Sequence, residues 1–277
     1  MTDAKWWDFT FSLDRMKDDE NAIMERLDEL CERWAYGRET GKNTGYAHLQ
    51  GRVVFKVGKE LATIKNQLEE VLPTAHWSKT HVRDFNYTEK EGDFVRSWEK
   101  ALRKFAQIEL KQWQQEVVDQ LTFQSDRQVL CIVNEGGNVG KSWLAKFLEA
   151  THRADVCPVT DGDASNYLEY CLNHPSKGYV FDIPKADTIK TKKAMWRAIE
   201  QIKNGCLYDR RYTSRKLWID PPRVVIFTNE YPPVDTLSSD RWQVFTICHV
   251  LGECRGLQQM TPIWDEDAHD YFWRPQC

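Results

Sequence analysis

Residues 129–148 carry the groups that a phosphate-binding loop requires. Residues 129–133 are a short apolar run typical of a buried strand, and a loop with three glycines follows, ending in Gly-Lys-Ser at 140–142. Apolar residues then recur at helical spacing from Trp143 onward. Glycines let backbone N–H groups face phosphate oxygens with no Cβ in the way, and the helix N-terminus adds the positive end of its dipole. The order of strand, glycine-rich loop, Gly-Lys-Ser and helix therefore predicts a P-loop.

This loop predicts ATP with Mg²⁺ as a cofactor. In a P-loop, Lys141 reaches the β and γ phosphates, and the Ser142 hydroxyl holds Mg²⁺. The usual first glycine of the motif falls on Glu135, so the pattern departs from the consensus at that position. The alternative is a glycine-rich turn that happens to precede Lys-Ser. The residues expected to cradle the phosphates are Gly136, Gly137, Asn138, Val139 and Gly140.

An apolar strand that ends in an acid follows the predicted P-loop. Residues 177–182 read Lys-Gly-Tyr-Val-Phe-Asp, and Asp182 lies about 40 residues after Lys141. Such a Walker B acid holds Mg²⁺ through water. An Ile-Pro pair follows in place of a second acid, so the general base for water attack is open, with Asp187 as a candidate.

A second set of residues, in the first hundred, has the types needed to cleave a phosphodiester. His48 and Gln50 lie two apart on a predicted strand, so both point to one face, and Glu39 is the nearest upstream carboxylate. Imidazole with oxygen donors suits Mg²⁺ or Mn²⁺. Tyr87 and Lys90 are three apart and share a face of a short predicted helix. A tyrosine beside such an ion can attack a phosphodiester while the metal stabilises the developing charge. Taken singly, a strand histidine or a tyrosine is more often a packing residue.

Hydrophobic periodicity predicts the elements that must position these residues. In the first hundred residues we expect an aromatic strand at 7–13, an amphipathic helix at 21–35, a polar loop at 36–45, a strand at 46–55, a helix at 60–71 and a further strand within 74–85. Residues 96–120 contain no Pro or Gly and predict a charged interdomain helix. Residues 195–202 predict a helix, and 224–229 a buried strand that ends in Asn229.

Composition limits the class of protein. The 277 residues suffice for two domains, and 41% hydrophobic with 29% charged residues is typical of soluble globular proteins. No apolar run approaches the roughly 18 residues of a membrane span, and the N-terminus lacks an apolar signal core, so no membrane contact is expected. The eight cysteines form no C-x-x-C pair and are expected to be reduced thiols of an intracellular protein.

A net charge of −4 means that nucleic acid would have to bind at local basic patches. One such patch lies at 203–223, where six basic residues occur against two acids and three aromatic residues interleave. Cations track phosphates and aromatic rings stack bases, so this segment predicts a hairpin that binds single-stranded DNA, with a solvated charged hairpin as the alternative. The basic residues are Lys203, Arg210, Arg211, Arg215, Lys216 and Arg223, and the aromatic residues are Tyr208, Tyr212 and Trp218.

Three segments, taken in order, resemble the rolling-circle motifs of HUH endonucleases. They are Phe-Thr-Phe-Ser-Leu-Asp at 9–14, His-Leu-Gln-Gly at 48–51 and Tyr-Thr-Glu-Lys at 87–90. In particular they resemble the His-x-Gln variant of the replication initiator (Rep) proteins of circoviruses, nanoviruses and related small circular single-stranded DNA viruses. The resemblance implies that Tyr87 is the single nucleophile, that Lys90 helps to position DNA and that Glu39 is the acidic metal ligand.

The second half of the chain resembles the superfamily 3 helicases. The P-loop, the acid-ended strand, the basic aromatic segment and a strand ending in Asn occur in the order of that family. The resemblance implies that Asn229 orients water at the γ-phosphate. Arg241 could act as an arginine finger across a subunit interface, with a surface arginine as the alternative. The chain after residue 252 matches no motif.

The resemblance implies a fold and a domain order. We expect an α+β HUH endonuclease domain over 1–95, an antiparallel sheet with flanking helices. A helical linker or oligomerisation segment is expected over 96–123. An α/β P-loop ATPase of the AAA+-like superfamily 3 type is expected over 124–277.

The implied function is that of a rolling-circle replication initiator. Such a protein nicks and rejoins single-stranded DNA at a stem-loop origin through a 5′-phosphotyrosine at Tyr87, and unwinds DNA with ATP. The implied partners are the origin, a ring of further copies (expected to be a hexamer) and the host replication machinery in the host nucleus. One rival is a DNA-binding P-loop ATPase with a non-cleaving N-terminal domain, and another is a small-molecule P-loop kinase.

Overall fold

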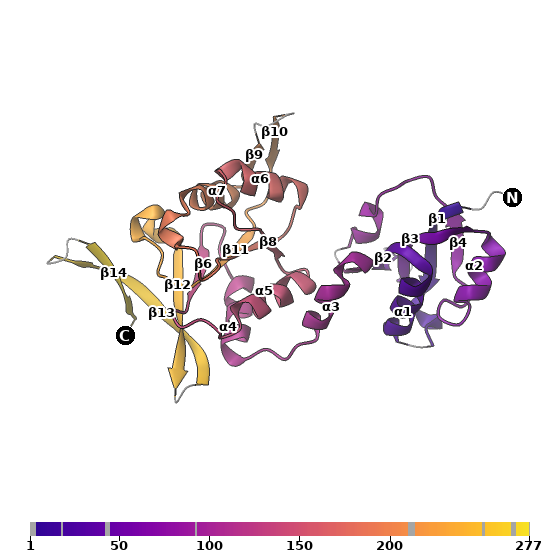
Figure 1. The fold of residues 1–277 in the computed structure, drawn as a ribbon, viewed down its shortest axis with the longest axis horizontal. Coiled ribbons are helices and arrows are strands. Elements are labelled where there is room, and N and C mark those ends of the chain that lie inside the picture. The colour runs from indigo at the N-terminus through magenta and orange to yellow at the C-terminus, as the bar shows by residue number, and fades with distance from the viewer. Residues whose placement is uncertain are drawn as a thin grey trace. The chain divides into compact units, whose positions relative to one another are not determined.

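The computed structural model divides the chain into two compact units, Met1–Arg103 and Lys104–Cys277, each with its own main sheet (Figure 1). It describes residues 4–17, 19–41, 45–91, 93–209, 214–250, 253–266 and 270–276. The first unit is an antiparallel sheet with helices, and the second is a mixed, mainly parallel sheet with helices. This succession confirms the predicted α+β region followed by an α/β region.

The sheet of the first unit has five strands in the order β4-β1-β3-β2-β5, and all neighbours are antiparallel. The strands are β1 (Ala4–Ser12), β2 (Cys31–Thr40), β3 (Ala47–Lys59), β4 (His76–Lys79) and β5 (Phe94–Arg96). The helices are α1 (Glu20–Leu30) and α2 (Leu61–Leu68), with short 3-10 turns at Leu13–Arg15, Asn86–Glu89 and Ser97–Glu99.

Strand alternation places the main apolar core on one face of this sheet and most polar side chains on the other, which also carries a small cluster of Ala35, Val54, Phe85 and Trp6. Side chains of β1, β2 and β3 form a single core with α1 and α2 through Trp7, Phe9, Phe11, Trp34, Tyr36, Leu49, Val53, Phe55, Ile23, Leu27, Ile64 and Leu68. Residues between these positions, among them Asp8, Gln50 and Arg52, point to the opposite face. The opposite face is therefore the one that carries the predicted cleavage residues.

The predicted helix at 21–35 is too long, and the first half of the predicted loop at 36–45 is strand, while residues 42–44 lie outside the described residues. α1 ends at Leu30, and Cys31–Thr40 forms β2 between β3 and β5. Trp34 follows Cys31 at a spacing that also fits a helix. On β2, however, Trp34 stacks on Tyr36 with ring centroids 5.6 Å apart, a contact that residues two apart on a strand can make. Because β2 pairs with β3 along its length, this segment is a strand and not the end of a helix.

The predicted helix at 96–120 is wrong as a single element. It begins with the last residue of β5 and continues as α3 (Lys100–Ala106) and α4 (Gln112–Thr122). The backbone N–H of Lys111 donates to the Gln114 side-chain oxygen at 2.9 Å, which starts a new helix at this point. The boundary between the two compact units falls inside α3.

The main sheet of the second unit has the order β14-β13-β12-β6-β11-β8-β7. The strands from β12 to β7 are parallel, and β13 and β14 add an antiparallel extension from the chain after residue 252. The bounds are β6 (Val129–Val133), β7 (Asp155–Val156), β8 (Gly178–Asp182), β11 (Arg223–Thr228), β12 (Trp242–Val250), β13 (Glu253–Asp265) and β14 (Asp270–Pro275).

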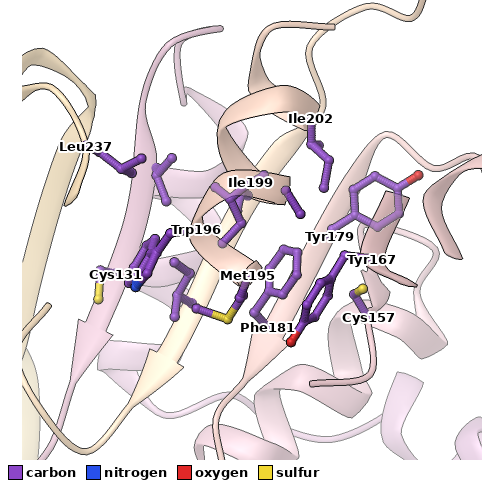
Figure 2. Close-up of a cluster of buried hydrophobic side chains, with 14 of the residues drawn as sticks. Cys131, Cys157, Tyr167, Tyr179, Phe181, Met195, Trp196, Ile199, Ile202 and Leu237 are labelled. Carbon is purple, nitrogen blue, oxygen red and sulfur yellow. The ribbon is translucent and has the colours of Figure 1, made fainter. Parts of the chain in front are cut away.

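Helices cover both faces of the parallel strands, which explains why β6 and β11 are almost wholly apolar. α4 and α5 (Lys141–Ala150) pack on one face. α6 (Ala164–Asn173) and α7 (Lys193–Lys203) pack on the other, where aromatic and aliphatic side chains interlock (Figure 2). None of the described helices is both long enough and apolar enough to cross a membrane.

Candidate functional sites

The predicted metal ligands lie together on the polar face of the first sheet. Glu39 of β2 is the direct cross-strand partner of His48 on β3, and Gln50 follows two residues later on the same face. The Nε2 atom of His48 lies 3.9 Å from a carboxylate oxygen of Glu39. Glu39 thus belongs to a strand, and its place beside His48 is fixed by the pairing of β2 with β3.

Two features of this cluster fit a divalent cation. Nδ1 of His48 lies 3.1 Å from the Tyr46 carbonyl, and in the neutral tautomer that donates to this carbonyl the lone pair is on Nε2. The Oε1 atom of Glu39 is buried and has no hydrogen-bond partner among the described residues. No group of three His, Cys, Asp or Glu side chains in the described part of the chain could hold a metal. A metal ion at this place would therefore also need the amide of Gln50, whose Oε1 atom accepts a hydrogen bond from the Thr10 hydroxyl at 3.1 Å.

Tyr87 reaches the same face of the sheet. It lies in the 3-10 turn Asn86–Glu89, where its hydroxyl donates to the Gly51 carbonyl and contacts the Gln50 side chain. Burial raises the pKa of the Tyr87 phenol, and the hydrogen bond with Gln50 opposes this shift. The ammonium of Lys90 lies 5.5 Å from the centroid of the Tyr87 ring. The structure thus brings the predicted nucleophile next to one of the predicted metal ligands.

Gly37 of β2 allows the Tyr87 turn to lie against the sheet. A Cβ on Gly37 would stand 2.0 Å from the Thr88 carbonyl oxygen, well inside van der Waals contact. The turn is tied down further by the buried Thr88 hydroxyl, which donates to the Phe85 carbonyl at 2.7 Å. The position of Tyr87 therefore depends on a backbone contact that only glycine permits.

The second site lies at the carboxyl ends of the central parallel strands. β6 leads into the glycine-rich loop, Asp182 ends β8, and Asn229 follows β11, which lies between those two strands. Ligands of open parallel sheets bind at this edge. Gly137, Asn138 and Gly140 have φ angles of 71°, 55° and 103°, and such left-handed residues help to turn successive N–H groups toward an anion.

Lys141 is folded back into this loop. Its ammonium donates to the Asn134 and Thr228 carbonyls at 3.2 and 2.5 Å and to the Asn229 side-chain oxygen at 2.8 Å. Burial lowers the pKa of Lys141 to about 8. The acceptors of the ammonium are thus neutral oxygens, and phosphate oxygens would be stronger partners for it.

Asp182 and Ser142 also meet at this edge. The Asp182 carboxylate is hydrogen-bonded by the Ser142 hydroxyl, and burial raises the pKa of Asp182. A carboxylate and a hydroxyl are the oxygen donors that hold Mg²⁺ in P-loop proteins. The structure thus brings together Lys141, Ser142, Asp182 and Asn229, which the sequence spreads over almost 90 positions.

Lys185 is a second lysine at the loop, and motif analysis missed it. Its Cδ and Nζ atoms lie 3.9 and 4.0 Å from the point where a Cβ would stand on Gly137, and the Asn229 side-chain oxygen lies 3.8 Å from that point. Burial lowers the pKa of Lys141, and the charge of Asp182 raises it. The charge of Lys185 is a smaller influence that lowers it further. The sequence signal is a basic residue just after an acid-ended strand, because such a residue must share the carboxyl edge with the P-loop.

The predicted basic hairpin is present. β9 (Cys206–Asp209) and β10 (Arg215–Trp218) pair antiparallel and stand out from the second unit (Figure 1). Arg215 and Lys216 are exposed, Lys216 pairs with Tyr208, and Trp218 is 68% exposed. The ammonium of Lys216 lies 4.9 Å from the Trp218 ring. Arg210, Arg211 and Tyr212 lie outside the described residues.

Lys203 is one of the basic residues of the predicted DNA-binding segment, and the structure contradicts a DNA contact by this residue. It ends α7, is only 3% exposed and donates to the Pro222 and Ser125 carbonyls at 3.0 and 3.2 Å. Burial lowers the pKa of Lys203 to about 8. A buried ammonium bound to backbone carbonyls cannot contact DNA, so Lys203 does not belong to the candidate DNA-binding surface.

The structure also contradicts an arginine-finger role for Arg241. A finger has to extend into the nucleotide site of a neighbouring subunit. Arg241 is only 3% exposed and donates to the Asn204 side chain at 2.7 Å, so it is held inside its own unit. Asp187, the candidate general base, is paired with Lys192 at 2.8 Å.

Together, an antiparallel sheet that carries the His48, Gln50 and Tyr87 set and a parallel sheet that carries a P-loop define a two-domain architecture consistent with that of replication initiator proteins. No protein-family model matches the chain. Over 174 residues, 63% of its length, the chain is 26% identical to the master replication proteins of Milk vetch dwarf virus (isolate N) and Faba bean necrotic yellows virus (isolate Syrian SV292-88).

A satellite protein gives a similar match. Over 137 residues, 49% of this chain and 47% of the relative, the chain is 25% identical to Para-Rep C9 of Faba bean necrotic yellows C9 alphasatellite. The chain is thus distantly homologous to nanovirus master replication proteins and to an alphasatellite replication protein. It covers 56% of the length of the two master replication proteins, so it spans about half of the curated relatives it matches.

We expect Gly37→Ala to displace the Tyr87 turn. The added methyl group would meet the Thr88 carbonyl, and overpacking of this kind costs about 1–3 kcal/mol of folding free energy. A shift of about 1 Å in a reacting group can slow a reaction about 100-fold. Urea unfolding and the rate of oligonucleotide cleavage measure the two effects. ATP hydrolysis in the second unit serves as the control, and unchanged stability with full cleavage would show that the close approach is dispensable.

We expect nucleotide affinity to fall as pH rises above about 8, because free Lys141 then loses the proton that its contact with phosphate requires. Bound phosphates raise the pKa of Lys141, so binding should take up a proton in this range, and affinity should fall about tenfold per pH unit. Calorimetry in two buffers of different ionisation enthalpy measures the proton. Lys141→Arg, which stays charged, should remove the pH dependence, and a persisting dependence would assign the proton to another group.

Proposed function

We propose that this chain initiates rolling-circle replication of a circular single-stranded DNA by nicking and rejoining DNA in its first unit and by ATP-driven unwinding in its second. The observation that carries the proposal is the position of the Tyr87 hydroxyl, at the Gln50 side chain on the face shared with His48 and Glu39. Distant homology to viral master replication proteins supports it. On this proposal the first unit is a single-tyrosine HUH endonuclease.

In the proposed nicking step, the Tyr87 oxygen bonds to phosphorus while the bond to the 3′ oxygen breaks. The phenolic proton passes to solvent and the leaving 3′ oxygen takes one up, so the products are a 5′-phosphotyrosine and a free 3′-hydroxyl. Glu39, His48 and Gln50 would hold Mg²⁺ or Mn²⁺, which stabilises charge on the phosphate when bound. Lys90 would contact the DNA backbone. Attack by a 3′-hydroxyl on the phosphotyrosine reverses the bonds and rejoins a strand.

In the second unit, the proposal assigns ATP to the loop of Gly136, Gly137, Asn138, Val139 and Gly140. Lys141 and Lys185 would neutralise the β and γ phosphates, Ser142 and Asp182 would hold Mg²⁺, and Asn229 would orient the attacking water. Arg215 and Lys216, with Tyr208 and Trp218, would bind single-stranded DNA. These roles are those of a superfamily 3, AAA+-like helicase.

The proposed partners are the origin stem-loop, further copies in a ring and the host replication machinery in the host nucleus. The proposed domains remain 1–95 and 124–277, with ring contacts through 96–123. Within that segment, α4 buries Trp113, Val117 and Leu121 in the second unit, and Gln114 donates to the Gly140 carbonyl at 3.1 Å. Only the exposed face of α4 is therefore free to meet a neighbouring copy.

We expect Tyr87→Phe to abolish the covalent adduct with a stem-loop oligonucleotide, because the change removes only the attacking oxygen. ATP hydrolysis should be unchanged. The adduct is read on a denaturing gel with Mn²⁺ and with EDTA. Tyr46→Phe is the matched control, since the Tyr46 ring stacks on His48 with centroids 5.2 Å apart. An adduct that persists in Tyr87→Phe would place the nucleophile elsewhere. No adduct from the wild-type chain would favour a non-cleaving DNA-binding ATPase.

We expect Lys185→Ala to lower the turnover of ATP about 10- to 100-fold, since a lost charge-assisted contact is worth about 1.5–3 kcal/mol. Steady-state hydrolysis measures the effect on kcat and KM. Lys177→Ala is the matched control, because Lys177 precedes the same strand, β8, at its opposite end. Equal turnover in the two variants would remove Lys185 from the nucleotide site.

A further inference from the structure

Asp8 and Arg52 form an ion pair beside the Tyr87 ring, with Arg52 buried and Asp8 partly exposed. They are direct cross-strand partners on β1 and β3. The Nε atom of Arg52 lies 2.6 Å from one carboxylate oxygen of Asp8, and a terminal nitrogen lies 2.9 Å from the other, so the pair is bidentate. The Arg52 side chain is only 5% exposed. Neither residue belongs to the metal-ligand set or to the nucleophile.

The remaining donors of Arg52 fix the plane of its guanidinium. One terminal nitrogen donates to the Asp84 carbonyl, and the other also donates to the Thr80 hydroxyl at 3.3 Å. The guanidinium carbon lies 4.4 Å from the centroid of the Tyr87 ring. Planar guanidinium groups stack on aromatic rings, so this distance places the Tyr87 ring against a rigidly held cation.

Folding stability alone does not account for this pair. A buried ion pair can often be replaced by apolar residues of similar size without loss of stability, because desolvation offsets most of the attraction between the charges. The opposite face of the same two strands does use apolar side chains, including Phe9, Phe11 and Val53. A charged pair at this one position therefore points to a task beyond packing.

We infer that Asp8 and Arg52 form a positioning clamp that holds the Tyr87 ring so that its hydroxyl stays beside Gln50. The inference rests on the proposed nicking function. Asp8 orients the guanidinium, and the guanidinium supports the ring. The Asp8 carboxylate also hydrogen-bonds the Tyr87 hydroxyl, so it holds the oxygen end of the side chain directly while Arg52 supports the ring. The clamp adds a second hold to the one at Gly37, since Gly37 fixes the backbone of the turn and Arg52 fixes the side chain.

A lysine at position 52 would keep the positive charge and lose the planar stack and the bidentate pairing. We therefore expect Arg52→Lys to form the covalent adduct about 10- to 100-fold more slowly in single turnover at saturating oligonucleotide. Affinity for the oligonucleotide and ATP hydrolysis should be unchanged. A merely structural role would not produce this separation of rate from affinity.

A double variant, Asp8→Leu with Arg52→Met, separates packing from positioning. It leaves no charge unpaired, so it should fold with near-wild-type stability, and it should still form the adduct as slowly as Arg52→Lys. It also decides the question if Arg52→Lys fails to fold. Arg33→Lys is the matched control, because Arg33 lies 3.9 Å from the Trp98 ring in the same unit and does not contact Tyr87.

The outcomes are distinct. Slow adduct formation in both Arg52 variants, with wild-type behaviour of Arg33→Lys, supports the clamp. Wild-type rates in the folded double variant would overturn the clamp and leave nicking by Tyr87 intact. Absence of any adduct with the wild-type chain would overturn the proposed cleavage function, and the clamp with it.

Discussion

The alternation of side chains along β3 is the constraint on which the first unit depends. Leu49, Val53 and Phe55 must enter the core with α1 and α2, so the residues between them must emerge on the opposite face. His48 and Gln50 are therefore held on that face by the hydrophobic core itself. A shift of the strand by one residue would bury polar side chains and expose the core at once. The packing of the apolar face thus fixes the positions of the side chains on the polar face.

The sequence allowed prediction where the chemistry is local. His48 and Gln50 are two apart on one strand, so spacing predicts that they share a face, and the order of the three motifs singled them out as candidates. The strand, glycine loop and helix of the P-loop are contiguous, so that candidate site follows from spacing. The proximity of the P-loop to Asp182 and Asn229 was also predictable, because the carboxyl ends of neighbouring parallel strands share an edge. The α+β and α/β succession was implied by the resemblance to HUH endonucleases and superfamily 3 helicases, and the periodicities gave only individual strands and helices.

The rest depended on contacts that spacing does not encode. The residues of the Asp8 and Arg52 pair are 44 positions apart and meet only because β1 and β3 are neighbours. Lys185 follows β8 and approaches Gly137 of the loop after β6, although β11 lies between these two strands. Arg241 was a candidate arginine finger for a neighbouring subunit, and its burial contradicts that role. Nothing in its local sequence distinguishes a buried arginine from an exposed one. Topology and burial, not residue type, separated these cases.

Both candidate sites retain groups that the folded chain alone does not satisfy well. The Oε1 atom of Glu39 is buried without a hydrogen-bond partner among the described residues, which costs free energy until a cation or donor approaches it. In the P-loop, Asn138 holds a left-handed φ of 55° that is uncommon for residues other than glycine, and Lys141 is held in a setting that lowers its pKa. A cation would satisfy the Glu39 oxygen, and phosphates would accept from the N–H groups that this loop turns outward and from the Lys141 ammonium. The first site therefore suits a positively charged ligand and the second a negatively charged one. A protein that binds a metal ion in one unit and a nucleotide in the other would require this difference.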